Sequence, residues 1–275
     1  MPFSSSRREF LTRSGLALAA ASFWPGRAFA QEAAGENGEF DFIAVNDVHF
    51  TDEKLCPPWF EKAFAAMRAS APKAEFVILS GDLTSENTDL EYSGIKALFP
   101  LFQIPVHLTL GNHDVRRDGD RSRFHRFFPG RLNYLLDHRG WQFISIDSVQ
   151  NRDAEKTKIP DGTLSWLDTN LKKLDPRRPT ILSTHFPLGY GLVRRPKNAD
   201  QIYSCLAKFN VRAIFNGHLH AYSQTMFKDA IVSTNRCCSR YRANYDNSPL
   251  KGWYVCEARQ GQVTRRFVSA PRELL

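Results

Sequence analysis

The stretch Leu108-Thr109-Leu110-Gly111-Asn112-His113-Asp114 decides the fold prediction, because an apolar run ends in side chains that bind metals or transfer protons. Four more apolar runs end in the same way, at Asp47-Val48-His49, Gly81-Asp82, His185 and Gly217-His218-Leu219-His220. In open α/β sheets the carboxyl ends of the strands share one edge, so we expect these side chains to converge on one crevice. We interpret the histidines outside these segments as structural or surface residues: His107, His125 and His138.

Around these segments short β-rich runs alternate with amphipathic helical runs, which predicts an α/β sandwich in one domain over residues 40–275. The expected strands are 40–45, 76–79, 106–110, 141–146, 180–183 and 212–215. The expected helices are 57–70, 89–102 and 163–174, the last beginning or capped at Asp161 or Thr163. Three later runs, 230–233, 253–256 and 263–268, are expected to form a second sheet edge.

The N-terminus is typical of an export signal. Ser6-Arg7-Arg8-Glu9-Phe10-Leu11 resembles a twin-arginine signal, and the apolar stretch after it is too short to span a bilayer. Ala28-Phe29-Ala30 offers the small residues that signal peptidase prefers. We therefore expect residues 1–30 to be a signal peptide for the twin-arginine translocase and residues 31–39 to be a disordered mature N-terminus. The mature protein would be periplasmic or secreted, without a transmembrane segment.

Charge and cysteine content narrow the function classes. The formal net charge is +8, and it becomes 33 − 28 = +5 without residues 1–30. This mild excess suits a small anionic substrate or a solvated surface, and no basic run interleaved with aromatics indicates a nucleic-acid track. The five cysteines lack C-x-x-C spacing, which argues against a thiolate zinc site. A disulfide between Cys256 and Cys237 or Cys238 is a hypothesis for an oxidising compartment.

Together the five segments resemble the calcineurin-like metallophosphoesterases, whose ordered signature is D-x-H, GD, GNH[DE], H and GHxH. All five blocks are present in order between residues 47 and 220. With this resemblance we expect a four-layer α/β/β/α sandwich of two mixed sheets flanked by helices. The resemblance implies two divalent or trivalent transition-metal ions, one held by Asp47, His49 and His220, the other by Asn112, His185 and His218, with Asp82 bridging both.

The chemistry of these residue types supports the same reading. Two cations need a shared anion, and mixed oxygen and imidazole ligands suit Mn, Fe or Zn better than Ca or Mg. A hydroxide that bridges such a pair would attack a phosphoester in line. The resemblance implies that His113 faces the substrate as a general acid or a charge stabiliser, with Asp114 orienting its ring. A plain turn or capping role for Asp114 stays open.

Substrate preference is less sharply indicated. Ser85 stands where the purple branch of the family has tyrosine, so no tyrosinate-iron colour is expected. Residues 79–84 and 111–116 resemble the bacterial phosphodiesterase branch, which includes cyclic-nucleotide phosphodiesterases. The alternatives are a phosphomonoesterase with the same site and a non-catalytic metal-bound binding protein. Candidate residues for holding the substrate anion, each also explicable as a surface cation, are Arg116, Arg117, Arg194, Arg195, Lys197 and Arg240.

Overall fold

Strand β1 (Phe40–Val45) shows why the chain forms layers, because five of its six side chains are buried. In this computed structural model, which describes residues 38–155 and 157–274, Phe40, Phe42 and Ala44 pack in one core. Ile43 and Val45 pack in another core, on the opposite face of the strand. A strand that is covered on both faces reads as an apolar run, as expected for the interior of an α/β protein.

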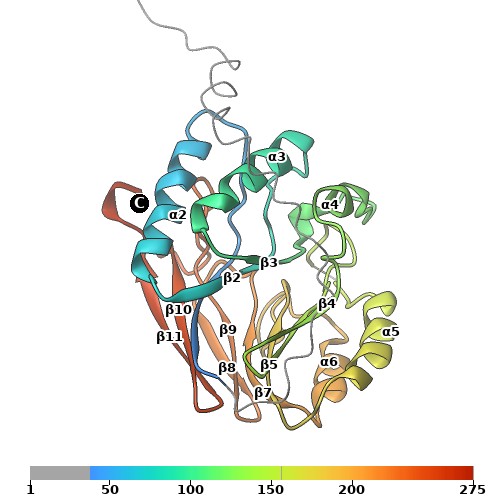
Figure 1. The fold of residues 1–275 in the computed structure, drawn as a ribbon. Helices are drawn as coiled ribbons and strands as arrows, with labels where there is room; N and C mark the ends of the chain where they lie inside the picture. Colours follow the sequence, from blue (N-terminus) through green and yellow to red (C-terminus); the bar gives the residue numbers. More distant parts are fainter. Residues whose placement is uncertain (1–37, 156, 275) are drawn as a thin grey trace, which may run out of the picture. The chain divides into compact units, whose positions relative to one another are not determined.

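The first sheet has five strands in the order β11-β10-β1-β2-β3 (Figure 1). Its further strands are β2 (Ala74–Ser80), β3 (Val106–Thr109), β10 (Gly252–Arg259) and β11 (Gln262–Ser269). Strands β1, β2 and β3 run parallel, whereas β10 and β11 pair antiparallel, so this sheet is mixed. The parallel part brings the carboxyl ends of its three strands to one edge.

The second sheet has six strands in the order β4-β5-β6-β7-β9-β8. These are β4 (Tyr134–His138), β5 (Trp141–Ser145), β6 (Pro179–Ser183), β7 (Asn210–Phe215), β8 (Ser223–Phe227) and β9 (Ala230–Thr234). The four central strands are parallel, and the two outer strands pair antiparallel with their neighbours. The prediction of two mixed sheets is therefore confirmed.

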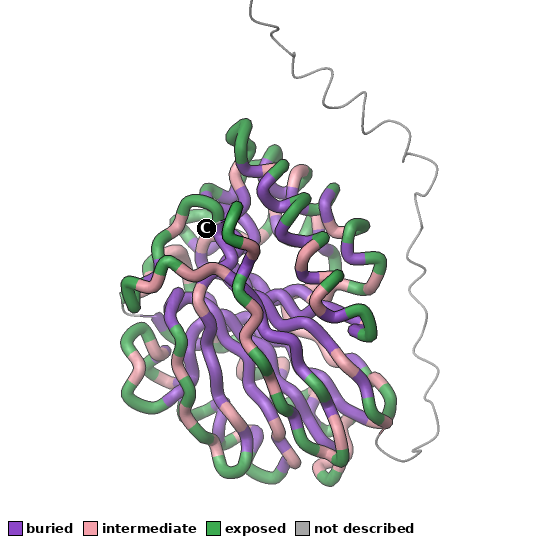
Figure 2. The backbone as a smooth tube through the Cα atoms, turned by 90° about the vertical axis from the view of Figure 1, so that its left-hand side faces the viewer, coloured by how far each residue is buried: buried purple, intermediate pink, exposed green. Residues whose placement is uncertain are grey.

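Three apolar cores separate four layers. Helices α2 (Cys56–Ser70) and α3 (Asp89–Leu98) pack on the outer face of the first sheet, together with Phe124 of α4 (Ser122–Phe127). Helices α5 (Asp161–Asn170) and α6 (Ala199–Leu206) cover the second sheet. Between the sheets lies an aromatic core that includes Phe42, Phe76, Trp141, Phe143 and Phe215. Figure 2 shows the inner strands as buried, with exposed residues in the outer helices, the loops and the edge of the sheet. The predicted four-layer α/β/β/α sandwich is confirmed.

Two predicted helices end earlier than expected. Helix α3 stops at Leu98 and continues as a 3-10 turn, Phe99–Phe102. The reason is Pro100, which has no N–H for the helical ladder. Helix α5 begins at Asp161, after Pro160, and gives way to the 3-10 turn Leu171–Lys173. The helix predicted at 57–70 is confirmed, with Cys56 as its first residue.

The edge strands differ most from the prediction. Strands β4 and β8 were not predicted, because they lie at the edges of the second sheet and carry mostly half-buried or exposed side chains. The three C-terminal runs do not share one sheet edge. Strand β9 lies inside the second sheet, whereas β10 and β11 form the edge of the first sheet, joined by the predicted turn at Arg259–Gln262.

The cysteines are all free thiols. Cys256 lies in the core between the sheets, and Cys238 lies in the core beneath α2 and α3, so the suggested disulfide between them is not formed. Cys237 instead accepts a hydrogen bond from Lys251 Nζ at 3.1 Å. The predicted signal peptide lies outside the described residues, as does most of the segment 31–39. None of the helices in the described part of the chain is long and apolar enough to cross a membrane.

Candidate metal centre

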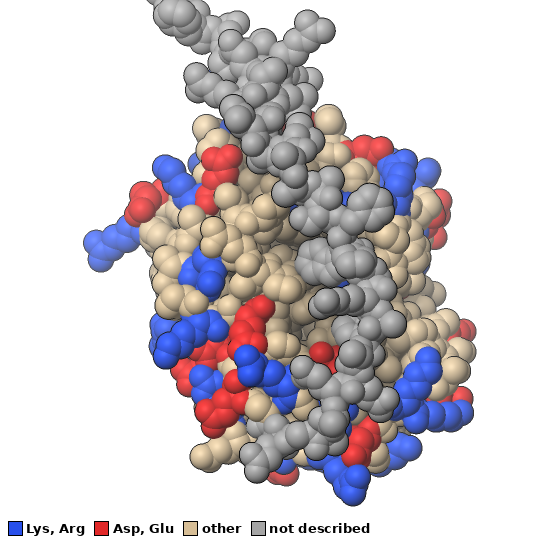
Figure 3. Space-filling view, in the orientation of Figure 1, with Lys and Arg blue, Asp and Glu red and all other residues tan. Residues whose placement is uncertain are grey.

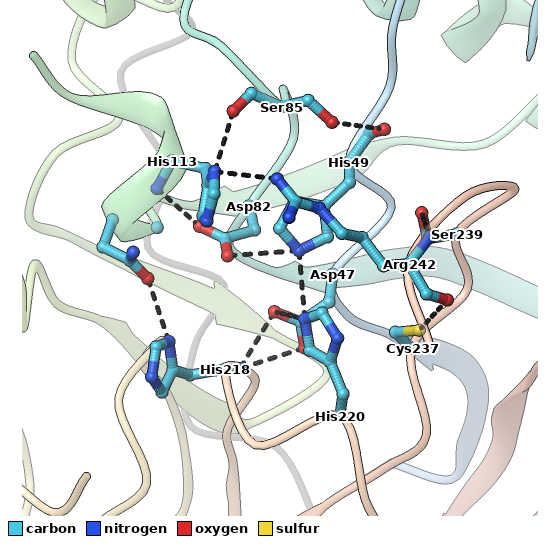
Figure 4. A network of polar contacts seen from close by, with 12 residues as sticks. Asp47, His49, Asp82, Ser85, His113, His218, His220, Cys237, Ser239 and Arg242 are labelled. Carbon is cyan, nitrogen blue, oxygen red and sulfur yellow. Dashed lines mark hydrogen bonds and ion pairs between the residues drawn. The ribbon is translucent and has the colours of Figure 1, made fainter. Parts of the chain in front are cut away.

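The seven predicted metal ligands come together at the carboxyl ends of the parallel strands. Each lies on a loop that directly follows β1, β2, β3, β6 or β7, and each is buried. The first sheet supplies four of them and the second sheet three. They are Asp47, His49, Asp82 and Asn112 from the first sheet, and His185, His218 and His220 from the second. Figure 4 shows most of this cluster from close by.

One half of the cluster gathers around His49 and His220. Their Nε2 atoms lie 3.0 Å apart. Nε2 of His49 is 3.3 Å from Asp82 Oδ2, and Nε2 of His220 is 3.5 Å from Asp47 Oδ1. Two imidazole nitrogens and two carboxylates therefore face one small space, which is a donor set suited to a transition-metal ion.

The other half gathers around Asn112. Its Oδ1 lies 2.9 Å from Nε2 of His185 and 2.9 Å from Nδ1 of His218. Nε2 of His185 is also 3.4 Å from Asp82 Oδ1. Asp82 thus presents one carboxylate oxygen to each half of the cluster, as a shared ligand between two cations would.

The backbone of these loops is strained at the predicted ligands. Asp47, His49, Asp82, His218 and His220 all have positive φ, between 43° and 66°. This left-handed conformation costs a non-glycine residue about 1–3 kcal/mol, and such strain clusters at functional sites. The strain indicates that the surrounding fold holds these side chains in place for a purpose other than stability.

Two glycines of the motifs allow the loops to approach one another. A Cβ on Gly111 would lie 2.1 Å from the backbone nitrogen of Asp82 and 2.2 Å from its Oδ1. A Cβ on Gly217 would lie 2.4 Å from the carbonyl oxygen of Ser80. Any larger residue at either position would therefore displace a loop that carries the predicted ligands.

Hydrogen bonds at the Nδ1 atoms of two histidines fix which ring nitrogen faces the cluster. Nδ1 of His185 donates to the carbonyl oxygen of Ser80 at 3.1 Å, and Nδ1 of His220 donates to that of Ala243 at 3.1 Å. Each Nε2 is thereby directed at the carboxylates. Hydrogen bonds of this kind also orient imidazoles that bind metals in proteins.

The electrostatics of the cluster fit bound cations. Burial, reinforced by neighbouring histidines, lowers the pKa of His49 and His218 well below the usual range, so both rings offer lone pairs. Burial opposes protonation of His220, but the Asp47 carboxylate holds its pKa well above the usual range. A cation beside Asp47 would replace that proton. The buried Nδ1 of His49 has no hydrogen-bond partner within the described residues.

His113 and Asp114 do not form the expected pair. Nδ1 of His113 donates to the carbonyl oxygen of Ser85 at 2.7 Å. The carboxylate of Asp114 instead accepts hydrogen bonds from the backbone N–H groups of Gly111, Leu83 and Thr84. The prediction that Asp114 orients the ring of His113 is therefore wrong, because its oxygens are taken by the loops. Burial, with the charge of Asp82, raises the pKa of Asp114 to about 7.

The sequence analysis missed two arginines that lie beside His113. An Nη2 of Arg152 lies 3.2 Å from Nδ1 of His113, and that of Arg242 lies 3.5 Å from it. Arg152 also donates to the carbonyl oxygen of Ser85 and to Glu86. Both arginines lie in long loops that carry no recognisable motif. For Arg152, its position after strand β5 is the one sequence feature that could have indicated a place at this crevice.

Three of the six predicted anion-holding cations are engaged elsewhere. Arg194 pairs with Glu155, Arg195 pairs with Asp200, and Arg240 stacks on Tyr241. Arg116 and Arg117 line a surface cleft together with Arg152. On the face drawn in Figure 3, basic and acidic side chains intermingle among the visible described residues.

Comparisons with known proteins agree with this geometry. Residues 40–222 match the family model described as calcineurin-like phosphoesterase. The chain is 26% identical over 155 residues to a 3',5'-cyclic-nucleotide phosphodiesterase of Nostoc, covering 54% of this chain and 57% of the relative. It is 24% identical over 200 residues to the glycerophosphodiester phosphodiesterase GpdQ of Enterobacter lignolyticus, covering 64% and 70%. The chain thus spans less than two thirds of the Nostoc relative.

Solved structures share the fold at low identity. A purple acid phosphatase from yellow lupin superposes with a TM-score of 0.63 and 14% identity, covering 86% of this chain and 52% of that chain. GAP50, the anchor in the inner membrane complex of Plasmodium, superposes with a TM-score of 0.57 and 16% identity, covering 85% of both chains. The family match covers more than half of the chain and includes all seven converging side chains. The chain belongs to the calcineurin-like phosphoesterase family.

Proposed function

We propose that this protein is a binuclear-metal-dependent phosphoesterase that hydrolyses phosphodiester bonds. The observation that carries the proposal is the position of Asp82, whose Oδ2 lies 3.3 Å from His49 Nε2 and whose Oδ1 lies 3.4 Å from His185 Nε2. Two donor groups that share one carboxylate suit two transition-metal ions, Mn, Fe or Zn. Bound there, the ions would acidify a shared water and neutralise charge on the phosphoryl oxygens.

The residues around His113 would handle the proton and the remaining charge. Because Nδ1 of His113 donates to Ser85, Nε2 is the ring atom left to give a proton to the leaving alkoxide. The guanidinium groups of Arg152 and Arg242 lie close to the same ring and would stabilise negative charge that develops on the phosphoryl group. The alternative of a non-catalytic metal-bound binding protein is less well supported, because the seven predicted ligands converge and the ring of His113 lies beside that of His49.

Preference for diesters rests on the relatives. Matching proteins carry the names cyclic-nucleotide phosphodiesterase and glycerophosphodiester phosphodiesterase. A phosphomonoesterase would share the metal centre and differ only in the pocket around it. The choice between them is therefore a matter of measured substrate preference.

The test is turnover of bis(p-nitrophenyl) phosphate and p-nitrophenyl phosphate by the metal-reconstituted protein. We expect metal-dependent turnover with a preference for the diester, lost in Asp82→Ala. We expect His113→Ala to lower kcat by roughly 10²- to 10⁴-fold, the usual contribution of a positioned acid. Arg177→Ala, a change at a residue 90% exposed, is the control and should behave as the wild type. Absence of metal-dependent turnover on both esters refutes an enzyme, and preference for the monoester refutes the diester assignment.

We further propose that the protein is exported by the twin-arginine route and acts in the periplasm or outside the cell. The support is the order of Arg7-Arg8, the apolar stretch and Ala28-Phe29-Ala30. The test is fractionation of cells that express the full chain, with mass spectrometry of the N-terminus. We expect mature protein beginning near Gln31 and its loss in the Arg7→Lys, Arg8→Lys double variant. Uncleaved protein that stays in the cytoplasm in both cases refutes export.

A further inference from the structure

A surface cleft next to the metal centre is lined mainly by arginines. It encloses about 410 Å³, and its lining residues are Glu86, Asn87, Arg116, Arg117, Asp118, Arg123 and Arg152. Four arginines and two carboxylates give the lining residues a charge of 4 − 2 = +2, one unit of which is offset by Asp89 outside the lining. A concave surface with an excess of guanidinium groups is suited to a phosphate, which carries about −1.5 to −2 charges near neutral pH.

The charges of this cleft are not all neutralised within the protein. Arg152 is paired with Glu86, and Arg123 is paired with Asp89, which lies outside the cleft lining. Arg116 and Arg117 are exposed, and neither has an ion pair within 4 Å among the described residues. Hydrogen bonds from Ser122, with a smaller contribution from the charge of Arg116, lower the pKa of Asp120, so Arg116 is only partly offset by a carboxylate. These two neighbouring side chains are therefore available to a ligand.

The walls of the cleft are fixed against each other. A Cβ on Gly119 would lie 2.6 Å from the carbonyl oxygen of Gln150, so the loop with Arg116 and Arg117 abuts the loop with Arg152. Arg121 joins the same two loops, since it donates to the carbonyl oxygens of Gly119 and Val149 and pairs with buried Asp147 at 2.6 Å. A site with fixed walls loses little ordering entropy when a ligand binds.

The cleft also adjoins the reacting groups. Arg152 belongs to its lining and lies 3.2 Å from Nδ1 of His113. Asn112, a predicted metal ligand, donates through Nδ2 to the carbonyl oxygen of Arg152 at 3.2 Å. A substrate whose scissile phosphoryl group lies at the metal centre would therefore extend its next few atoms past Arg152 into the cleft.

We propose that this cleft binds a second phosphate group of the substrate, so that the preferred substrate is a phosphodiester whose non-scissile side carries its own phosphate. This inference rests on the proposed phosphodiesterase function. Arg116 and Arg117 are its specificity-determining residues, and they contact the second phosphate rather than the scissile one.

The test compares two synthetic diesters, p-nitrophenyl propyl phosphate and p-nitrophenyl 3-phosphooxypropyl phosphate, by release of p-nitrophenol. We expect the kcat/KM of the wild type to be about tenfold or more higher for the ester with the second phosphate than for the propyl ester. A tenfold ratio corresponds to about 1.4 kcal/mol of additional binding free energy in the transition state. This ratio should fall toward one in the Arg116→Ala, Arg117→Ala double variant and at high salt, since exposed charges are screened. The exposed control Arg177→Ala should keep the wild-type ratio.

A binding measurement separates failure of this inference from failure of the proposed function. Calorimetry on the metal-loaded protein compares propyl phosphate with propane-1,3-diyl bisphosphate, and no turnover is needed. Tighter binding of the bisphosphate by the wild type, lost in the double variant, supports the cleft even if both esters resist hydrolysis. Turnover of both diesters at equal kcat/KM, or equal affinity for the two phosphates, overturns the inference while leaving the phosphodiesterase assignment intact.

Discussion

His113 and Asp114 are adjacent in the sequence but have separate roles. Nδ1 of His113 contacts the carbonyl oxygen of Ser85, whereas the carboxylate of Asp114 accepts three backbone N–H groups and the hydroxyl of Thr84. Asp114 thereby ties the loop after β2 to the loop after β3, which carry Asp82 and Asn112. It would act on the candidate metal centre through the positions of these loops.

This division of roles predicts the effect of Asp114→Asn. Asparagine has one acceptor oxygen where aspartate has two, so at least one of the backbone N–H groups would lose its partner. We therefore expect the free energy of unfolding to fall by roughly 1–3 kcal/mol, the cost of an unsatisfied buried group. Urea unfolding measures this, and the pH profile of kcat should keep its shape. An unchanged stability with a shifted pH profile would instead restore the pairing expected from the sequence.

Arg242 offers a second prediction for a single residue. Its guanidinium lies 3.5 Å from Nδ1 of His113, so Arg242→Ala removes a positive charge beside the expected phosphoryl position. We expect kcat/KM to fall by roughly 10²- to 10³-fold, the range for loss of one charge-stabilising group, with unchanged metal content. The matched control is Arg240→Ala, because Arg240 lies two residues before Arg242 in the chain and its guanidinium stacks on Tyr241. Equal losses in the two variants would show that the loop, not the contact, is responsible.

The loops after the parallel strands are the elements that build the site. They can pack closely against each other only because glycine stands at the points of contact. Gly111→Ala would place a methyl group 2.1 Å from the backbone nitrogen of Asp82. We expect calorimetric titration with Mn²⁺ or Zn²⁺ to show a loss of at least about tenfold in affinity, as for disrupted outer partners of metal ligands. An affinity equal to that of the wild type would refute the requirement.

A matched glycine in a helix serves as the control. Gly162 in α5 has no atoms within 4 Å of an added Cβ and no positive φ. Gly162→Ala should therefore raise stability by about 0.5–1 kcal/mol, because alanine loses less backbone entropy in a helix. Metal affinity should stay at the wild-type value.

The sequence predicted those elements that leave a clear local pattern of apolar residues. Central strands such as β1 and β6 are buried on both faces, so their apolar runs stand out. Edge strands β4 and β8 are half exposed and lack this signal. The seven proposed ligands could be picked out from the sequence because each follows such a run. Arg152 and Arg242 were not, because the path of a long loop depends on tertiary contacts that spacing does not encode.

For the whole molecule, the candidate metal centre joins the two sheets. Asp47, His49, Asp82 and Asn112 follow strands of the first sheet, and His185, His218 and His220 follow strands of the second. Ions bound here would hold both halves of the sandwich together at one edge. They would also offset the strain at the five predicted ligands that have positive φ.

Metal removal should therefore destabilise the whole fold. Ions present at about 1,000 times their Kd add about 4 kcal/mol of stability. For a chain of this size that corresponds to a change in Tm on the order of 10 °C. Scanning calorimetry before and after chelation, with Mn²⁺ added back, measures the shift. An equal Tm for stripped and reloaded protein, with metal analysis confirming both states, would contradict this prediction.

The proposed binuclear centre is tested most directly by anomalous X-ray scattering from crystals of the metal-loaded protein. The account predicts two metal peaks per chain, one on each side of Asp82, with one among Asp47, His49 and His220 and the other among Asn112, His185 and His218. In Asp82→Ala, which lacks the shared ligand, it predicts that both peaks disappear or that two separate peaks are no longer seen. A single peak in the wild type, or peaks away from these seven side chains, would contradict it.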